Sequence, residues 1–191
     1  MPTDRQQQIL DAALALIVEE GLDSLTMARL ARRVGVTEPA LYRHFRNKHD
    51  LVRQLVRSLD AGFGAAFAAL APDTPPARAL ATLMDAVLAE LARIRGVNFQ
   101  FLSVSAYHRD TAIREELQAL FRRQRERLAG YLRGAAGRGE LRPGLDPDAT
   151  ALAFLGLCQG LVTRSLLSGW QVPPAADSRA VLDVFLKGVI G

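Results

Sequence analysis

Residues 26–45 read TMARLARRVGVTEPALYRHF, and this stretch decides how the N-terminal part of the chain folds. Two short helices that cross steeply need a small residue where they touch, and Ala31 supplies it. Four residues later the turn needs a left-handed backbone, which Gly35 adopts without strain at a Cβ atom. Six residues further on, Leu41 provides an apolar side chain that packs back on the first helix. The spacing predicts a helix-turn-helix with its second helix over 38–45.

The starts of two helices carry their own signals. Thr37 is expected to cap the second helix of the motif with its hydroxyl group. An acidic Glu38 suits the positive end of the helix dipole, and Pro39 loses no hydrogen bond in a first turn. Asn47, followed by Asp50 three residues later, predicts the cap of the next helix.

Positive charge is concentrated around this motif. Residues 26–57 hold eight cationic and two acidic side chains, a net charge of +6, whereas the whole chain carries only +4. The remaining residues are therefore slightly acidic. A short basic stretch on a helix-turn-helix is typical of a surface that faces DNA phosphates. We therefore predict DNA binding, and the alternative is a helix-turn-helix that serves only as a packing corner.

The rest of the chain has helical periodicity and no sustained strand alternation. The expected helices span 4–20, 26–33, 38–45, 47–70, 77–95, 97–107, 110–135, 147–168 and 178–190. Breaks at 71–76, 134–147 and 169–174 are rich in Gly or Pro. The fold is expected to be all-α, with a helix-turn-helix DNA-binding domain at 1–48 and a helical effector-binding and dimerisation domain at 49–191. That boundary lies inside the fourth helix.

Several classes of function lack the residues they need. A single cysteine, Cys158, forms no intrachain disulfide and is expected to be buried and inert. The apolar run 149–162 is shorter than a membrane span of about 20 residues, so we expect a cytoplasmic protein with no membrane partner. His49 and His108 have no partner at ligand spacing, so no metal is expected. No catalytic constellation is present, so we expect no enzyme activity and no cofactor.

A longer signature surrounds the motif. Residues 41–51 read LYRHFRNKHDL, and Ile9, Leu14, Gly21 and the stretch 25–36 lie upstream of them. Over about residues 4–57 the chain resembles the N-terminal domain of the TetR/AcrR family of transcriptional regulators. The resemblance implies three N-terminal helices that bind double-stranded DNA. It also implies variable C-terminal helices that bind a small-molecule effector and form a homodimer.

The resemblance also assigns roles to single residues. The family's phosphate-contacting positions correspond to Thr26, Tyr42, His44 and Lys48. Its base-reading positions correspond to Thr37, Glu38, Ala40 and Arg43. Arg43 is expected to fork onto guanine, Glu38 to accept from a cytosine amino group, and Ala40 to touch a thymine methyl. Two alternatives remain, in which Tyr42 packs partly in the core and Glu38 only matches the helix dipole. Phe45 is expected to be core.

The helix expected at 147–168 is apolar on most of its circumference, so it needs neighbours on both sides. A stripe of small residues on it lets another helix approach closely. Together with the helix at 178–190 it predicts a four-helix bundle between two copies, and the resemblance implies the same. The candidate interface residues are Ala153, Gly156, Gly160, Leu161, Leu182 and Phe185. The alternative is an ordinary pair of helices within one chain.

Aromatic side chains gather in the middle of the chain and predict a pocket for an apolar or aromatic effector. The expected lining residues are Phe67, Leu83, Val87, Phe101, Tyr107, Phe121, Gln124 and Phe154. Gln124 and His108 are the expected polar anchors. The alternative is that the aromatic residues are plain core.

The predicted function is a ligand-responsive transcriptional regulator. It is expected to repress by binding a near-palindromic operator as a dimer and to leave DNA when the effector binds. Two other interpretations remain open. One is a DNA-bound helical dimer whose second domain binds other proteins, and the other is an all-helical enzyme or lipid-binding protein.

Overall fold

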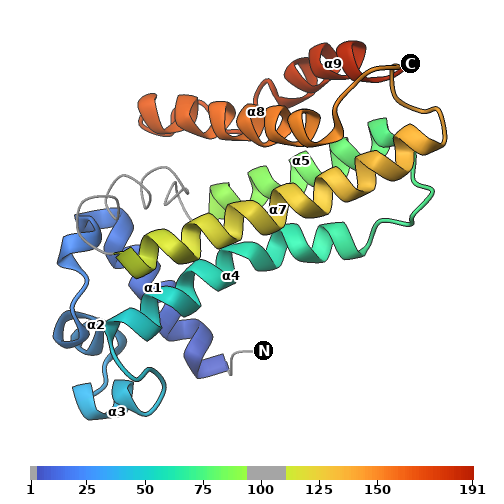
Figure 1. Cartoon of the computed structure of the whole chain (residues 1–191). Coiled ribbons are helices and arrows are strands. Elements are labelled where there is room, and N and C mark those ends of the chain that lie inside the picture. Colours follow the sequence, from blue (N-terminus) through green and yellow to red (C-terminus); the bar gives the residue numbers. More distant parts are fainter. Residues whose placement is uncertain (1–3, 94–110) are drawn as a thin grey trace. The chain divides into compact units, whose positions relative to one another are not determined.

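The structure is a computed structural model of the 191-residue chain, and it describes residues 4–93 and 111–191. The helix expected at 97–107 lies outside the described residues. The described helices are α1 (Asp4–Glu20), the 3₁₀ helix η1 (Leu22–Ser24), α2 (Met27–Val34), α3 (Glu38–Tyr42), α4 (Lys48–Ala68), α5 (Pro76–Arg93), α7 (Thr111–Gly137), α8 (Pro147–Leu167) and α9 (Ser178–Val189) (Figure 1). Within the described ranges the only β pairing is one isolated bridge. The expected all-α class is confirmed.

The described chain divides into two compact units. The first contains residues 4–59 and 111–119, and the second contains 60–93 and 120–191. Helices α4 and α7 therefore each contribute residues to both units.

The first unit has its own core. Helix α1 packs on α2, and α2 packs on α3. The apolar residues of α1 recur at helical spacing, so they share one face and are buried together. The buried side chains of this unit include Ile9, Leu10, Ala13, Leu16, Ile17, Leu25, Leu30, Ala31, Leu41, Phe45, Leu51, Val52, Leu55 and Val56.

The turn of the helix-turn-helix has the predicted geometry. Thr26 caps α2, and its hydroxyl oxygen accepts a hydrogen bond from the backbone N–H of Arg29 at 3.2 Å. Gly35 ends α2 in the left-handed region with φ 72° and ψ 37°. The N–H of Val36 then donates to the Ala31 carbonyl at 3.0 Å, which satisfies a carbonyl at the helix end.

The start of α3 differs from the prediction. Thr37 is the N-cap residue, but its side chain makes no capping hydrogen bond. The second helical position is Pro39, which has no N–H, and the N–H of Ala40 donates to the Thr37 backbone carbonyl at 3.0 Å. Both donors that a cap would use are therefore missing or engaged. Helix α3 is also shorter than predicted, because it ends at Tyr42 rather than at residue 45.

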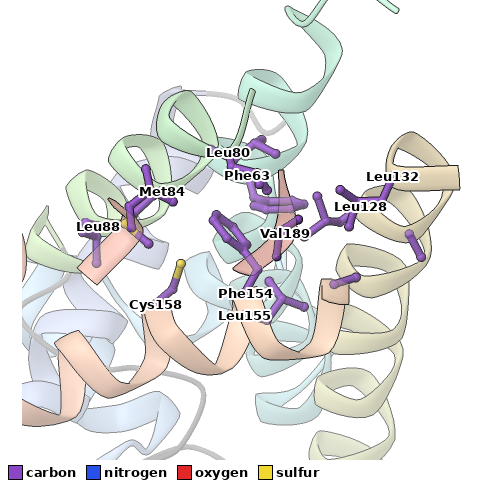
Figure 2. Packing of buried hydrophobic residues seen from close by; sticks show 14 of the residues in the cluster. Phe63, Leu80, Met84, Leu88, Leu128, Leu132, Phe154, Leu155, Cys158 and Val189 are labelled. Atoms are coloured by element: carbon purple, nitrogen blue, oxygen red, sulfur yellow. The ribbon is translucent and has the colours of Figure 1, made fainter. Parts of the chain in front are cut away.

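The second unit is built around α8. Helices α5, α8 and α9 contact one another. Figure 2 shows Phe154 and Cys158 of α8 pointing into a cluster that includes Met84 and Leu88 of α5 and Val189 of α9. The Cys158 thiol is 2% exposed, and burial raises its pKa to about 12, so it is a protonated thiol at neutral pH.

Helix α8, at 21 residues, is longer than the apolar run 149–162 that it contains. Among the described helices it is the one whose length and composition would allow it to cross a membrane. Core helices of globular proteins can have the same length and composition. Here Phe154, Cys158 and Val162 lie in the core cluster.

Gly35→Ala is expected to destabilise the protein by about 1 to 2 kcal/mol, because a Cβ atom is strained in the left-handed region. No atom lies within 4 Å of the added Cβ, so the loss comes from the backbone alone. Urea unfolding measures it. Gly137→Ala is the control, because Gly137 has equally open space without a positive φ. Equal stability of the Gly35 variant and wild type would contradict the strain argument.

Candidate nucleic-acid interface

Helix α3 and the turn after it present two different faces. Leu41 and Phe45 are fully buried, and the N–H of Phe45 donates to the Leu41 carbonyl at 3.0 Å. Tyr42 and Arg43 lie between them in sequence and are exposed, with Tyr42 at 48%. Because the buried residues are four apart, they share one face and turn the intervening side chains outward. Phe45 is core, as predicted, whereas Tyr42 is not.

The structure leaves all eight predicted DNA-contacting residues accessible to solvent. The exposed ones are Thr26, Thr37, Glu38, Tyr42 and Arg43, and the half-buried ones are Ala40, His44 and Lys48. Because the Thr37 hydroxyl makes no cap, it is available to a ligand. The Thr26 oxygen accepts the capping bond, so its own O–H remains able to donate.

Ion pairs divide the eight cations of residues 26–57 into two groups. Arg33 forms two short hydrogen bonds with Glu19, at 2.6 and 2.7 Å, and Arg29 pairs with Glu20. The guanidinium group of Arg33 lowers the pKa of the Glu19 carboxyl. Arg53 and Arg57 both lie beside the carboxylate of Glu116 in α7.

The other four cations have no ion pair within the described parts of the chain. They are Arg32, Arg43, Arg46 and Lys48. Arg43 is the C-cap residue of α3, Arg46 lies between α3 and α4, and Lys48 is the first residue of α4. The positive charge that remains unneutralised is therefore concentrated beside α3, where DNA phosphates would neutralise it.

Arg46 was missing from the predicted contacts. Its side chain is exposed and without an ion pair, while its backbone N–H donates to the Asp50 carboxylate at 3.0 Å. The N–H of Asp50 in turn donates to the Asn47 side chain at 2.8 Å, which confirms the predicted cap of α4. The hydrogen bond from the Arg46 N–H is the main cause of a lowered pKa at Asp50. The sequence indicated Arg46 only as part of a basic stretch.

Two models of known protein families match this chain. A family model described as bacterial regulatory proteins of the tetR family matches residues 9–55. A second model, described as the C-terminal part of BetI-type transcriptional repressors, matches residues 76–191. The chain belongs to the TetR family.

Similar proteins span nearly the whole chain. TtgR of Pseudomonas putida, an HTH-type transcriptional regulator, is 29% identical and covers 96% of this chain and 90% of its own. The nucleoid occlusion factor SlmA of Marinobacter nauticus is 28% identical, covering 91% and 89%. The solved structure of SmeT, the repressor of a Stenotrophomonas maltophilia multidrug efflux pump, is 26% identical, with a TM-score of 0.77 and coverage of 97% and 90%. This TetR-family protein is a transcriptional regulator and not an enzyme.

The predicted effector residues of the regulator are spread over the core of the second unit. Leu83 and Phe154 are fully buried, and Phe67, Val87 and Phe121 pack against the same cluster. The amide of Gln124 donates to Asp60 at 3.4 Å. Phe101, Tyr107 and His108 lie outside the described residues.

A groove of about 530 Å³ lies between α5 and α9. Its lining includes Ala81, Met84, Leu182 and Leu186. None of the predicted effector residues lines it. In the described residues no group of three His, Cys, Asp or Glu side chains is placed to hold a metal ion.

The predicted dimer residues fall into two groups. Ala153, Gly156 and Gly160 are exposed, and no atom lies within 4 Å of a Cβ added at either glycine. Leu161 and Leu182 are instead buried in the core of the same chain, at 5% and 6% exposure. Phe185 is half-buried, with its ring 6.0 Å from that of Phe154.

Lys48→Ala is expected to reduce the salt dependence of duplex binding. A cation that contacts one phosphate contributes about 0.9 to the slope of log affinity against log salt. Arg33→Ala is the matched control, since that cation is already paired with Glu19. Fluorescence anisotropy titrations at several salt concentrations measure both slopes. An equal fall in slope for the two variants would show that ion pairing does not decide which of these cations bind DNA phosphates.

Proposed function

We propose that this regulator is a cytoplasmic, ligand-responsive repressor that binds a near-palindromic operator as a homodimer. The observation that carries the proposal is the accessible face of α3, followed by Arg43, Arg46 and Lys48, three cations that lack an ion pair in the described residues. A helix edge with this combination of exposure and charge suits the major groove.

The proposed contacts divide into positioning and reading. Hydroxyl, imidazole and ammonium donors at Thr26, Tyr42, His44 and Lys48 would bind phosphates and fix the register. We call residues 37–46 the α3 segment, and its outward residues Thr37, Glu38, Ala40 and Arg43 would then meet base edges. Exposure of Tyr42 at 48% supports the first role over packing in the core.

The proposed dimer surface is the exposed apolar face of α8 and α9. We call it the α8–α9 surface and define it by Leu152, Ala153, Gly156, Gly160, Leu166, Leu167 and Val184. Leu167 is 83% exposed and Val184 is 72% exposed, which is unfavourable in water for large apolar side chains. The open space at both glycines allows close approach by helices of a second copy. Leu161 and Leu182 are not part of this proposal, because they already pack inside one chain.

The proposed effector is apolar or aromatic and binds within the second unit. The aromatic side chains of Phe63, Phe67 and Tyr131 pack on one another there, with ring centroids 6.1 and 6.4 Å apart. We call the first unit, residues 4–59 and 111–119, the reading head. An effector that binds better to a state with a different separation of the two reading heads of the dimer would draw the dimer off DNA. Similarity to SmeT, the repressor of an efflux pump, supports repression as the direction.

A second candidate is a DNA-bound dimer that acts through other proteins, without an effector. Similarity to the nucleoid occlusion factor SlmA over 91% of the chain favours it. Titration of a library of aromatic compounds against the protein–operator complex separates the candidates, because only a ligand-responsive repressor is released.

The function is tested by selecting duplexes from a random pool with the purified protein. The expected result is an inverted repeat with half-site centres about 34 Å apart or slightly more, because two linked heads read successive turns of one DNA face. Arg43→Ala is expected to weaken binding and relax preference at one base pair, by about 1 to 3 kcal/mol. A selected pool without sequence preference would overturn the proposal.

Gly160→Glu is expected to convert the dimer to monomers and to weaken operator binding with it, because it places a charge on the α8–α9 surface. A Cβ added at Gly160 has no atom within 4 Å beyond its own stretch of helix, so we expect the fold to be retained. Gly130→Glu on α7 is the control, where the nearest side-chain atom is at an ordinary 3.8 Å. Analytical ultracentrifugation measures the mass, and a Gly160→Glu dimer of unchanged affinity would refute this surface.

A further inference from the structure

Helices α4 and α7 are joined in the first unit by one carboxylate and two guanidinium groups. The side chain of Arg57 donates to Oε1 of Glu116 at 3.5 Å, and Nε of Arg53 lies 3.8 Å from the same oxygen. The Glu116 side chain is 19% exposed, so water screens these interactions only in part. Glu116 belongs to α7, far from the helix-turn-helix in sequence.

Arg53 extends this contact toward the end of the α3 segment. Its Nη2 lies 3.5 Å from the Asp50 carboxylate, whose side chain is 15% exposed. The same carboxylate accepts the backbone N–H of Arg46. Three polar steps therefore link Glu116 to the backbone of the residue that follows the buried Phe45.

Glu116 also supplies negative charge beside two guanidinium groups, those of Arg53 and Arg57. Nε of Arg53 is buried and has no hydrogen-bond partner among the described residues, and Glu116 is the acid beside it. Without Glu116, Asp50 would be the one acid left in the described residues that forms an ion pair with Arg53. Asp50 already contacts Arg53 through Oδ1 while its Oδ2 accepts the Arg46 N–H, and without Glu116 the guanidinium group would pull more strongly on the carboxylate that holds this N–H.

We propose that Glu116 is a positioning residue for DNA recognition. It shares Arg53 with Asp50 and holds Arg57 against α7, which keeps Arg53 from drawing the Asp50 carboxylate away from the backbone of Arg46 at the end of the α3 segment. The proposal rests on the proposed DNA-binding function. It adds that a residue of α7, outside the helix-turn-helix, sets how well the helix-turn-helix discriminates its operator.

Two effects of removing the Glu116 charge have opposite signs, which makes the proposal testable. Loss of an acid near a basic surface raises affinity for every duplex alike. Loss of positioning lowers affinity for the operator alone. The ratio of operator affinity to scrambled-duplex affinity therefore reports positioning, and the scrambled duplex by itself reports charge.

The experiment compares Glu116→Gln, Glu116→Asp and the control Glu115→Gln in the full chain, using the selected operator and a scrambled duplex. Glu115 is exposed and has no ion pair in the described parts of the chain. Glu116→Gln is expected to lower the affinity ratio about tenfold, the size of effect seen for coupled sites without ligand contact. Glu116→Asp should retain most of the ratio, and Glu115→Gln should match wild type.

A second readout needs no DNA. Amide hydrogen exchange of Arg46, followed by NMR, is expected to be faster in Glu116→Gln than in wild type. Asp60→Asn is the control, because Asp60 also joins α4 to α7, through Arg123 and Arg127 at 3.3 Å, but in the second unit. It should leave the Arg46 amide unchanged.

An unchanged affinity ratio in Glu116→Gln, or equal tightening on both duplexes, would overturn the proposal while leaving DNA binding intact. Unchanged exchange at Arg46 would overturn it as well. Failure of the wild-type protein to bind any duplex would instead refute the proposed function.

Discussion

Burial of Leu41 and Phe45 holds the DNA-facing side of this regulator in place. Helix α3 has only five residues, too few to be stable through its own hydrogen bonds. Each of the two side chains is fully buried, which contributes about 1.5 to 3 kcal/mol apiece. The small side chain of Ala31 leaves room for α3 to pack on α2. The outward direction of Tyr42 and Arg43 is a consequence of this packing.

Ion pairs then decide which cations near the exposed side of α3 remain available to DNA. Surface ion pairs contribute little to stability, usually less than about 1 kcal/mol. Their effect here is on the distribution of charge, because Glu19, Glu20 and Glu116 neutralise cations that lie away from α3. In the described residues, three of the four cations that remain without an ion pair therefore lie at the end of α3 or in the few residues after it.

Features fixed by a few neighbouring residues could be predicted from the sequence. The left-handed Gly35 and the Asn47 cap belong to this class. Thr37 is the N-cap residue of α3, as predicted, but its hydroxyl makes no capping hydrogen bond, because Pro39 lacks an N–H and the N–H of Ala40 donates to the Thr37 carbonyl. The pairing of Arg57 with Glu116, 59 residues away, has no local signal at all. Periodicity also does not separate a pocket wall from a core, so Leu83 and Phe154 carried the same pattern as any buried residue.

The sharing of α4 between the two units bears on protein engineering. A truncation after residue 48 would discard Leu51, Val52, Leu55 and Val56, all of which are buried. The fragment would lose part of the hydrophobic interior on which its three small helices pack. Grafting this reading head onto another sensor therefore requires a splice beyond residue 59. It also requires residues 111–119 to travel with the head, although they are encoded more than fifty codons downstream.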